Sequence, residues 1–196
     1  GFFHTGATTN VTDWVLIELH DAATPATIIS RRAAFIRVDG RITELDTLSN
    51  ISFRNVPNNN YYVVIRHRNH LAIRTLTVRP VNGTLGTAIP AIYDFSTSQS
   101  QAYQNASIIS NAAMKQLSAG VFGLWGGDVN RNNTVKYTGA NNDAVALLAF
   151  LGANQGLTLG TTTVGVYSPG DLNMDGLVKY TGANNDAVFL LSVLGS

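Results

Sequence analysis

Short runs of alternating apolar and polar residues fill the first half of the chain. They are rich in β-branched and aromatic residues, as strands are, and Gly, Pro and Asn turns separate them. Asp39-Gly40 is a strong hairpin signal. The runs expected to be strands are residues 13–19, 26–38, 41–45, 51–53, 61–68, 71–78 and 92–95. About seven short strands at this spacing predict a β-sandwich.

The pattern changes towards the C-terminus, where one stretch occurs twice. Residues 127–152 and 170–195 start 43 positions apart and are identical at eighteen of 26 aligned positions. Each copy is a polar loop followed by an apolar run with leucines at helical spacing, which predicts two loop–helix units. We therefore expect a mainly β chain with a small α part. Residues 1–125 would form the sandwich domain with an N-terminal tail, and residues 126–196 the duplicated module.

The second polar loop carries side-chain oxygens at alternate positions. These are Asp171, Asn173 and Asp175, and Gly176 follows directly. Alternate spacing in a tight loop directs three oxygens at one centre, the Gly permits a sharp turn, and Leu177 can offer its backbone carbonyl. This order is the first half of a calcium-binding loop.

The first loop keeps only part of this pattern. It has Asp128 and Asn130, but Asn132 and Asn133 stand where the second loop has Asp and Gly, and Thr134 takes the position of Leu177. Asn tolerates a positive φ better than most residues, so we expect the turn to be retained. One formal charge is lost, which predicts weaker calcium binding in this loop.

The far end of each loop is unusual, because Gly stands at the twelfth position, where an acidic residue normally closes the loop. The nearest carboxylates, Asp143 and Asp186, come at position sixteen and open the apolar runs. One interpretation makes them helix N-caps. The other, which we favour, makes them the closing calcium ligands, with Asn142 and Asn185 as substitutes.

These loops and the motif VKYTGANND resemble a dockerin-type, EF-hand-like calcium module. The motif resembles, in particular, the variant at the C-terminal ends of large secreted proteins of Bacteroidetes-type bacteria. The resemblance covers residues 126–196 and implies two bound Ca²⁺ ions. Gly at position twelve departs from that family, and no residue on the helix after the loop matches the cohesin-contacting residues of dockerins.

The first half carries a second resemblance. WVLIEL, a DG hairpin and FRNVPNNNYYVVIRH follow one another as in the prealbumin-like and Cna-B-like sandwiches of bacterial surface proteins. NYYVVIRHRNHL is also similar to a sandwich module that often precedes the VKYTGANND repeat in adhesin-like proteins. An isopeptide crosslink of the Cna-B kind is excluded, because no Lys precedes Lys115.

Composition narrows the classes further. The chain has 196 residues, of which 45% are hydrophobic and 13% charged, so it can bury a sizeable core. It has no Cys, so a large core or bound metal would have to stabilise a secreted form. The net charge of +1 argues against a nucleic-acid partner, and no apolar run is long enough to span a membrane. Because the chain begins with Gly, we expect a processed part of a longer secreted precursor.

Catalytic signatures are absent from the sequence, including G-x-S-x-G, H-E-x-x-H and the P-loop. The strongest polar cluster is residues 67–70, His-Arg-Asn-His. Two His at this spacing suit a metal, but no Cys, Asp or Glu stands nearby in sequence to complete a site. We favour a strand end whose polar residues hydrogen-bond a loop or line a contact surface, and we expect no enzyme.

Three functions remain open. The leading one is a non-catalytic, calcium-stabilised extracellular or cell-surface module for adhesion or for assembling an extracellular structure. It would contact a protein or polysaccharide through exposed Tyr61, Tyr62, Arg66 and Arg68. The second is a carbohydrate-binding module that uses aromatic residues on one sheet face, with candidates Trp14, Tyr61, Tyr62 and Tyr93. Since Tyr61 and Tyr62 are adjacent on a strand, at most one of them can contribute. The third is a self-assembling fibre subunit whose tail, with Phe2 and Phe3, adds a strand to another copy.

Overall fold

A computed structural model of the chain describes residues 10–46, 49–81, 92–104, 112–155, 163–164 and 167–195. The chain is mainly β, with antiparallel sheets and two α-helices among these residues. It divides into two compact units. The first comprises residues 1–66 and 73–122, and the second comprises residues 67–72 and 123–196. Residues 67–72 comprise a turn between two strands of the sheet and the adjoining strand ends. We call this segment the turn 67–72, and it belongs to the second unit.

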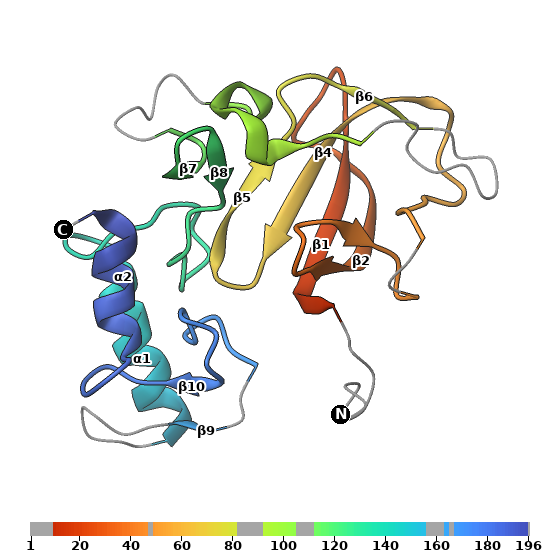
Figure 1. Ribbon diagram of the computed structural model, residues 1–196. Helices are drawn as coiled ribbons and strands as arrows, with labels where there is room; N and C mark the ends of the chain where they lie inside the picture. Colours follow the sequence, from red (N-terminus) through yellow and green to blue (C-terminus); the bar gives the residue numbers. More distant parts are fainter. Residues whose placement is uncertain are drawn as a thin grey trace. The chain divides into compact units, whose positions relative to one another are not determined.

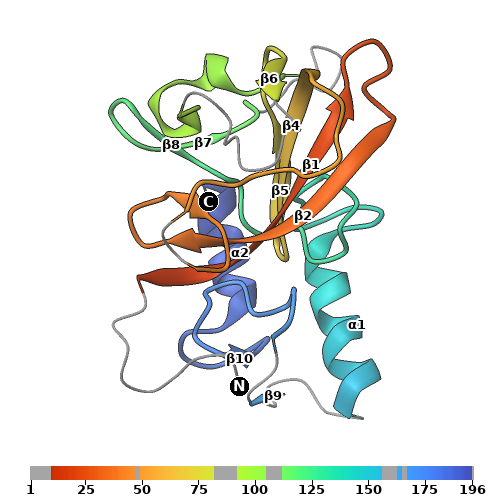
Figure 2. The ribbon, with the colours of Figure 1, turned by 90° about the vertical axis from the view of Figure 1, so that its right-hand side faces the viewer.

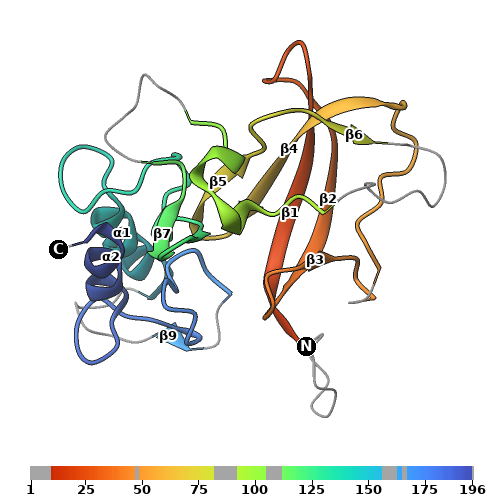
Figure 3. The same cartoon turned by 45° about the horizontal axis from the view of Figure 1, so that its top comes forward.

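The largest sheet is antiparallel and six-stranded, in the order β3-β2-β1-β4-β5 with β6 also paired to β4 (Figure 1). Its long strands β2, β1 and β4 are adjacent in Figure 3. The bounds are β1 Val11–Asp21, β2 Ile28–Arg37, β3 Ile42–Thr43, β4 Asn59–His67, β5 His70–Arg74 and β6 Arg79–Val81. The expected strands at 13–19, 26–38, 41–45, 61–68 and 71–78 are confirmed, with shifted ends.

Alternation along β1 explains which face of the sheet is buried. Val15, Ile17 and Leu19 are at most 3% exposed, and they stand opposite Ala34, Ile65 and Val63 on the neighbouring strands. Successive side chains of a strand point to opposite faces, so these residues share one face. Burial of this apolar face stabilises the first unit.

Some expectations for the first half are not met. Residues 92–94 form no strand, and Phe95 begins the short 3₁₀ helix η1 Phe95–Thr97, because the Asp94 side chain accepts from Ser96 N and caps that turn. A second turn, η2, covers Gln99–Gln101, and β7 Lys115–Ser118 pairs with β8 Val121–Gly123. Within the described residues, the two facing sheets of a seven-stranded sandwich are not confirmed.

The second unit contains the two repeats. Its elements are α1 Asp143–Gln155, β9 Thr163–Val164, β10 Leu177–Val178 and α2 Asp186–Leu194, all labelled in Figure 2. Each helix begins at the Asp that opens its apolar run. None of the helices that the structure describes is long and apolar enough to cross a membrane.

The repeats share their core rather than each forming its own. One buried cluster joins Val129 and Ala144 of the first repeat to Leu172 and Leu190 of the second. Another joins α1 to the second repeat through Leu147, Leu151, Val178 and Ala187. Val178 lies in β10, which pairs with β9, and its side chain packs against the apolar side of α1.

Candidate functional site

The two polar loops turn in the same way, residue by residue. Asn133 has φ +63° and Gly176, at the equivalent position, has φ +84°. Gly139 and Gly182, at the twelfth positions, have φ +87° and +88°. The prediction that Asn133 preserves the sharp turn is confirmed, since Asn tolerates the left-handed region.

Hydrogen bonds from the backbone fix the oxygens of the second loop. Asp171 Oδ2 accepts from Gly176 N at 3.2 Å, Asn173 Oδ1 accepts from Asp175 N at 3.0 Å, and Asp175 Oδ1 accepts from Leu177 N at 2.9 Å. Side-chain oxygens at alternate positions thus hold the turn together from inside. This is the local chemistry that favours Asp and Asn in turns.

The first loop repeats these bonds with one difference at its opening Asp. Asn130 Oδ1 accepts from Asn132 N at 3.0 Å, and Asn132 Oδ1 accepts from Thr134 N at 2.8 Å. Asp128, however, uses both oxygens, since Oδ1 accepts from Asn132 N at 3.0 Å and Oδ2 from Asn133 N at 3.2 Å. Both carboxylate oxygens of the first loop are therefore already hydrogen-bonded.

Asp186 closes its loop by hydrogen bonds to the backbone. Its side chain is fully buried, with Oδ1 accepting from Leu172 N at 2.6 Å and Oδ2 from Lys179 N at 2.8 Å. The two ends of the loop thus meet on one carboxylate. Asp143 does the same in the first loop, accepting from Val129 N at 2.9 Å and Lys136 N at 2.8 Å.

The helix caps are the preceding Asn residues. Asn185 Oδ1 accepts from Val188 N, and Asn142 Oδ1 accepts from Val145 N, both at 2.8 Å. The interpretation of Asp143 and Asp186 as N-caps is therefore wrong, because each is the first residue inside its helix. Asn142 and Asn185 use their amide oxygens as caps, the usual role of Asn before a helix.

Burial works against the negative charges of the repeats. Desolvation raises the pKa of Asp128, Asp143 and Asp186, and the backbone hydrogen bonds that each accepts lower it less. Ionised carboxylates are costly to bury without a positive partner. An added cation beside them would therefore stabilise the charged forms.

Asp171 has the one side-chain oxygen in these loops that is buried without a hydrogen-bond partner among the described residues. Its Oδ2 accepts from Gly176 N and faces the Arg68 guanidinium at 3.4 Å, while its Oδ1 accepts no bond. A buried polar atom without a partner costs free energy, so a cation or a water molecule bound to this oxygen would stabilise the loop. Among the proposed side-chain ligands of the second loop only Asp171 fits a calcium ion in this respect, because the oxygens of Asn173 and Asp175 accept hydrogen bonds within the loop. Within the described part of the chain, no group of three His, Cys, Asp or Glu side chains gathers to hold a metal.

The turn 67–72 binds both repeats of its unit. Asn69 is fully buried, and its Nδ2 donates to Asp171 O at 2.6 Å. Its backbone carbonyl accepts from Gly127 N at 2.7 Å and from Asp128 N at 3.2 Å. Arg68 donates to Ser168 O as well as to Asp171. The favoured interpretation, a polar strand end that hydrogen-bonds a loop, is correct, and the loops are those of the repeats.

The residues expected to bind a partner differ in how exposed they are in the structure. Tyr61 is 2% exposed and its hydroxyl donates to Pro57 O, so the expectation that it is exposed is wrong; alternation places it on the core face. Arg68 is also not at the surface, with 7% of its side chain exposed. Arg66 is partly exposed and pairs with Glu18 at 2.8 Å. Phe2 and Phe3 lie outside the described residues.

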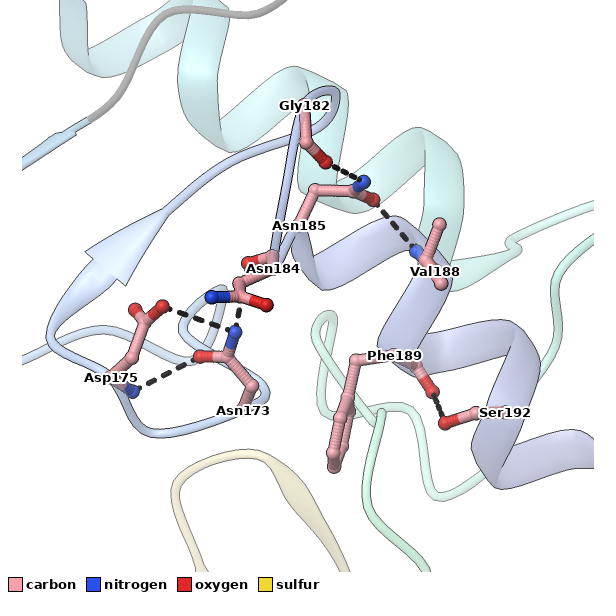
Figure 4. A pocket seen from close by; sticks show the side chains of 8 residues that line it. All are labelled: Asn173, Asp175, Gly182, Asn184, Asn185, Val188, Phe189 and Ser192. Atoms are coloured by element: carbon pink, nitrogen blue, oxygen red, sulfur yellow. Dashed lines mark hydrogen bonds between the residues drawn. The ribbon is translucent and has the colours of Figure 1, made fainter.

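A surface hollow of about 550 Å³ lies beside the second loop (Figure 4). Amide and carboxylate groups of the loop form one side, and the start of α2 forms the other. Its lining residues are Asn173, Asp175, Gly182, Asn184, Asn185, Val188, Phe189 and Ser192. No sequence pattern predicts this hollow, because its shape depends on how the loop returns to the helix.

Comparison with known proteins finds no match to the chain among family models, curated proteins or solved structures.

Proposed function

We propose that the chain is a non-catalytic, calcium-stabilised extracellular or cell-surface module used for adhesion or for assembling an extracellular structure. The observation that carries the calcium part is the buried, unpartnered Oδ1 of Asp171 at the first position of the second loop. The extracellular part rests on the likeness of the repeats to secreted bacterial modules.

Calcium would be held in the second loop by side-chain oxygens of Asp171, Asn173 and Asp175 and by the carbonyl of Leu177. These are hard oxygen donors, which Ca²⁺ prefers. The ion would add positive charge near Asp186, whose hydrogen bonds all come from backbone N–H groups. Asp186, whose two oxygens accept three backbone N–H bonds, would act chiefly by holding the loop ends together.

The first loop would bind calcium more weakly. Its equivalent ligands are Asp128, Asn130, Asn132 and the carbonyl of Thr134, with one carboxylate fewer and with both Asp128 oxygens already hydrogen-bonded. Asp143 would close this loop as Asp186 closes the other. Calcium affinity falls as the number of charged ligands falls, so two sites of unequal affinity are expected.

Calorimetric titration with Ca²⁺, on protein stripped with chelator, tests the proposal alongside thermal melting. Binding of two ions with unequal affinities and a raised melting temperature would support it, because a ligand that binds only the folded state stabilises that state. The variant Asp171→Asn should lose the tighter site while Asp39→Asn, on the surface of the first unit, should keep it. Absence of heat and of any shift in melting would refute calcium binding.

A carbohydrate partner is a second candidate for the first unit, because Trp14, Phe35 and Tyr62 share the sheet face opposite to the buried apolar face. The rings of Trp14 and Phe35 are 4.2 Å apart between centroids, and Tyr62 and Tyr103 flank the guanidinium of Arg74 at 4.3 and 3.8 Å. Aromatic faces suit the apolar faces of sugar rings. A glycan array separates the candidates, since specific binding that Trp14→Ala abolishes would favour the carbohydrate-binding module.

A further inference from the structure

Three polar atoms of the turn 67–72 converge on one another. His67 Nδ1 lies 2.9 Å from Asn69 Oδ1 and 2.8 Å from His70 Nδ1, and His70 Nδ1 lies 2.7 Å from Asn69 Oδ1. All three belong to the second unit. They form a nearly equilateral triangle of two imidazole nitrogens and one amide oxygen.

The amide is oriented by its other contacts. Asn69 Nδ2 donates to Asp171 O, so the atom facing the two imidazoles is the carbonyl oxygen, an acceptor. The Asn69 backbone carbonyl is also held, by Gly127 N at 2.7 Å. Because Asn69 is fully buried, this oxygen is fixed in place between the two rings.

No placement of protons on the two imidazoles turns all three short contacts into hydrogen bonds. If both Nδ1 atoms carry a proton, each can donate to Asn69 Oδ1, but two N–H groups then face each other across 2.8 Å. If only one carries a proton, the other nitrogen turns its lone pair towards the amide oxygen. One short contact is repulsive in every arrangement of protons. A single cation bound by all three atoms makes the three contacts favourable together.

The size of the triangle indicates the kind of cation. At metal–ligand distances of about 2.0–2.1 Å, neighbouring ligands are about 2.9 Å apart in an octahedral site and about 3.3 Å apart in a tetrahedral one. The observed separations of 2.7–2.9 Å match three ligands on one face of an octahedron. Imidazole nitrogen suits Ni²⁺ and Cu²⁺, which take octahedral or tetragonal geometry, whereas Ca²⁺ requires oxygen.

We propose that His67, Asn69 and His70 bind one divalent transition-metal ion of the nickel–copper kind, with water at its remaining positions. This site is separate in ligands and in chemistry from the calcium loops. It does, however, lie on the residue that joins them, since Asn69 binds Asp171 O and Gly127 N. An ion here would hold the turn in the conformation that connects both repeats.

The test is calorimetric titration of the full chain with NiCl₂ and CuCl₂, after treatment with chelator and in saturating Ca²⁺ so that the loops do not respond. We expect one equivalent to bind, with ZnCl₂ weaker than CuCl₂. His67→Phe and His70→Phe should each weaken binding by about tenfold or more, because a first ligand matters at least as much as its outer supports. The matched control His4→Phe removes a histidine from the N-terminal stretch and should bind as the unmodified chain does.

Circular dichroism without metal checks that each variant folds. If the Phe variants fail that check, paramagnetic line broadening of the unmodified chain by substoichiometric Cu²⁺ decides. Backbone amide signals of residues 67–70 and of Gly127 should then disappear first. The proposal is overturned by the absence of binding, by equal affinity in the folded Phe variants, by loss of binding in His4→Phe, or by broadening centred elsewhere.

Discussion

The two units bury carboxylates in opposite ways. In the sheet, Glu18 is 1% exposed and is surrounded by Arg31 and Arg66 at 2.8 Å and His20 at 3.0 Å. Burial raises its pKa, but hydrogen bonds from Arg66, His20 and Arg31 outweigh burial and lower that pKa from 4.5 to about 2. In the repeats, Asp186 is equally buried but accepts only backbone N–H groups, and its pKa is raised.

The difference is that the carboxylate in the sheet has positively charged partners, whereas three carboxylates in the repeats have neutral hydrogen-bond donors. Glu18 has cationic side chains of its own unit, so its ionised form is stabilised without help. Asp128, Asp143 and Asp186 have neutral amide donors, which only partly offset the loss of water. A cation from solution should therefore stabilise the repeats and leave the stability of the sheet unchanged.

The largest expected effect comes from removing a loop-closing carboxylate. Asp186→Ala would leave the N–H groups of Leu172, Asn173 and Lys179 without their acceptor. We expect the free energy of unfolding of the second unit to fall by about 3 kcal/mol or more, since each buried orphan donor costs about 1–3 kcal/mol. Urea denaturation in chelator measures this loss.

Asp175→Ala is the matched control, because Asp175 is exposed and accepts one backbone bond from Leu177 N. Its cost should stay below about 1 kcal/mol. Equal losses for the two variants would contradict the view that Asp186 holds the loop ends together.

A smaller effect is expected in the sheet. Glu18→Gln keeps the shape of the side chain but leaves the guanidinium groups of Arg31 and Arg66 without a charged acceptor. Both are partly exposed, at 58% and 41% of the side chain, so water compensates in part. We expect the free energy of unfolding of the first unit to fall by about 2 kcal/mol. The fluorescence of Trp14, in a chain that also carries Trp125→Phe, monitors this unfolding. Asp39→Asn, whose pairs with Arg37 and Arg41 are looser, should change stability by less than about 0.5 kcal/mol.

The stability of the first unit should also depend on pH through Glu18. Its pKa is about 2 in the folded chain, below the ordinary 4.5, so the ionised form favours folding. That contribution is present above pH about 4.5 and is lost as the pH falls towards 2. Trp14 fluorescence across this range measures it. The stability of the first unit should change less with pH in Glu18→Gln. An unchanged pH dependence in this variant would show that another group is responsible.

Local patterns were enough to predict the long strands, the two helices and the turn at Asn133, but not the 3₁₀ turns η1 and η2 or the strands β7 and β8. Alternation located β1 and β4, helical spacing located α1 and α2, and the tolerance of Asn for a positive φ predicted the turn at Asn133. Alternation also showed that Tyr61 and Tyr62 must face opposite ways. It did not show which face is the core, because both residues are amphipathic.

Contacts between distant parts of the chain were beyond such patterns. The side-chain amide of Asn69 donates to Asp171 O, about a hundred positions away, and the backbone carbonyl of Asn69 accepts from Gly127 N. Neither bond produces a periodic pattern in the sequence. The role of Asp186 was missed for a related reason. A carboxylate before a helix suggests a cap or a ligand, whereas its actual bonds depend on both loop ends returning to one point.

The smallest effect is expected from exchanging the loops' differing residues, and it tests the comparison within the repeats themselves. Asn132→Asp with Asn133→Gly gives the first loop the Asp and Gly of the second, and Asp175→Asn takes one charge from the second. Each charged ligand tunes calcium affinity, so we expect a change of about tenfold, in opposite directions. Calorimetry on the two variants would show the affinities of the loops approaching each other. Affinities that stay apart would mean that Asp171, with its unpartnered oxygen beside Arg68, sets the difference rather than the fifth position of the loop.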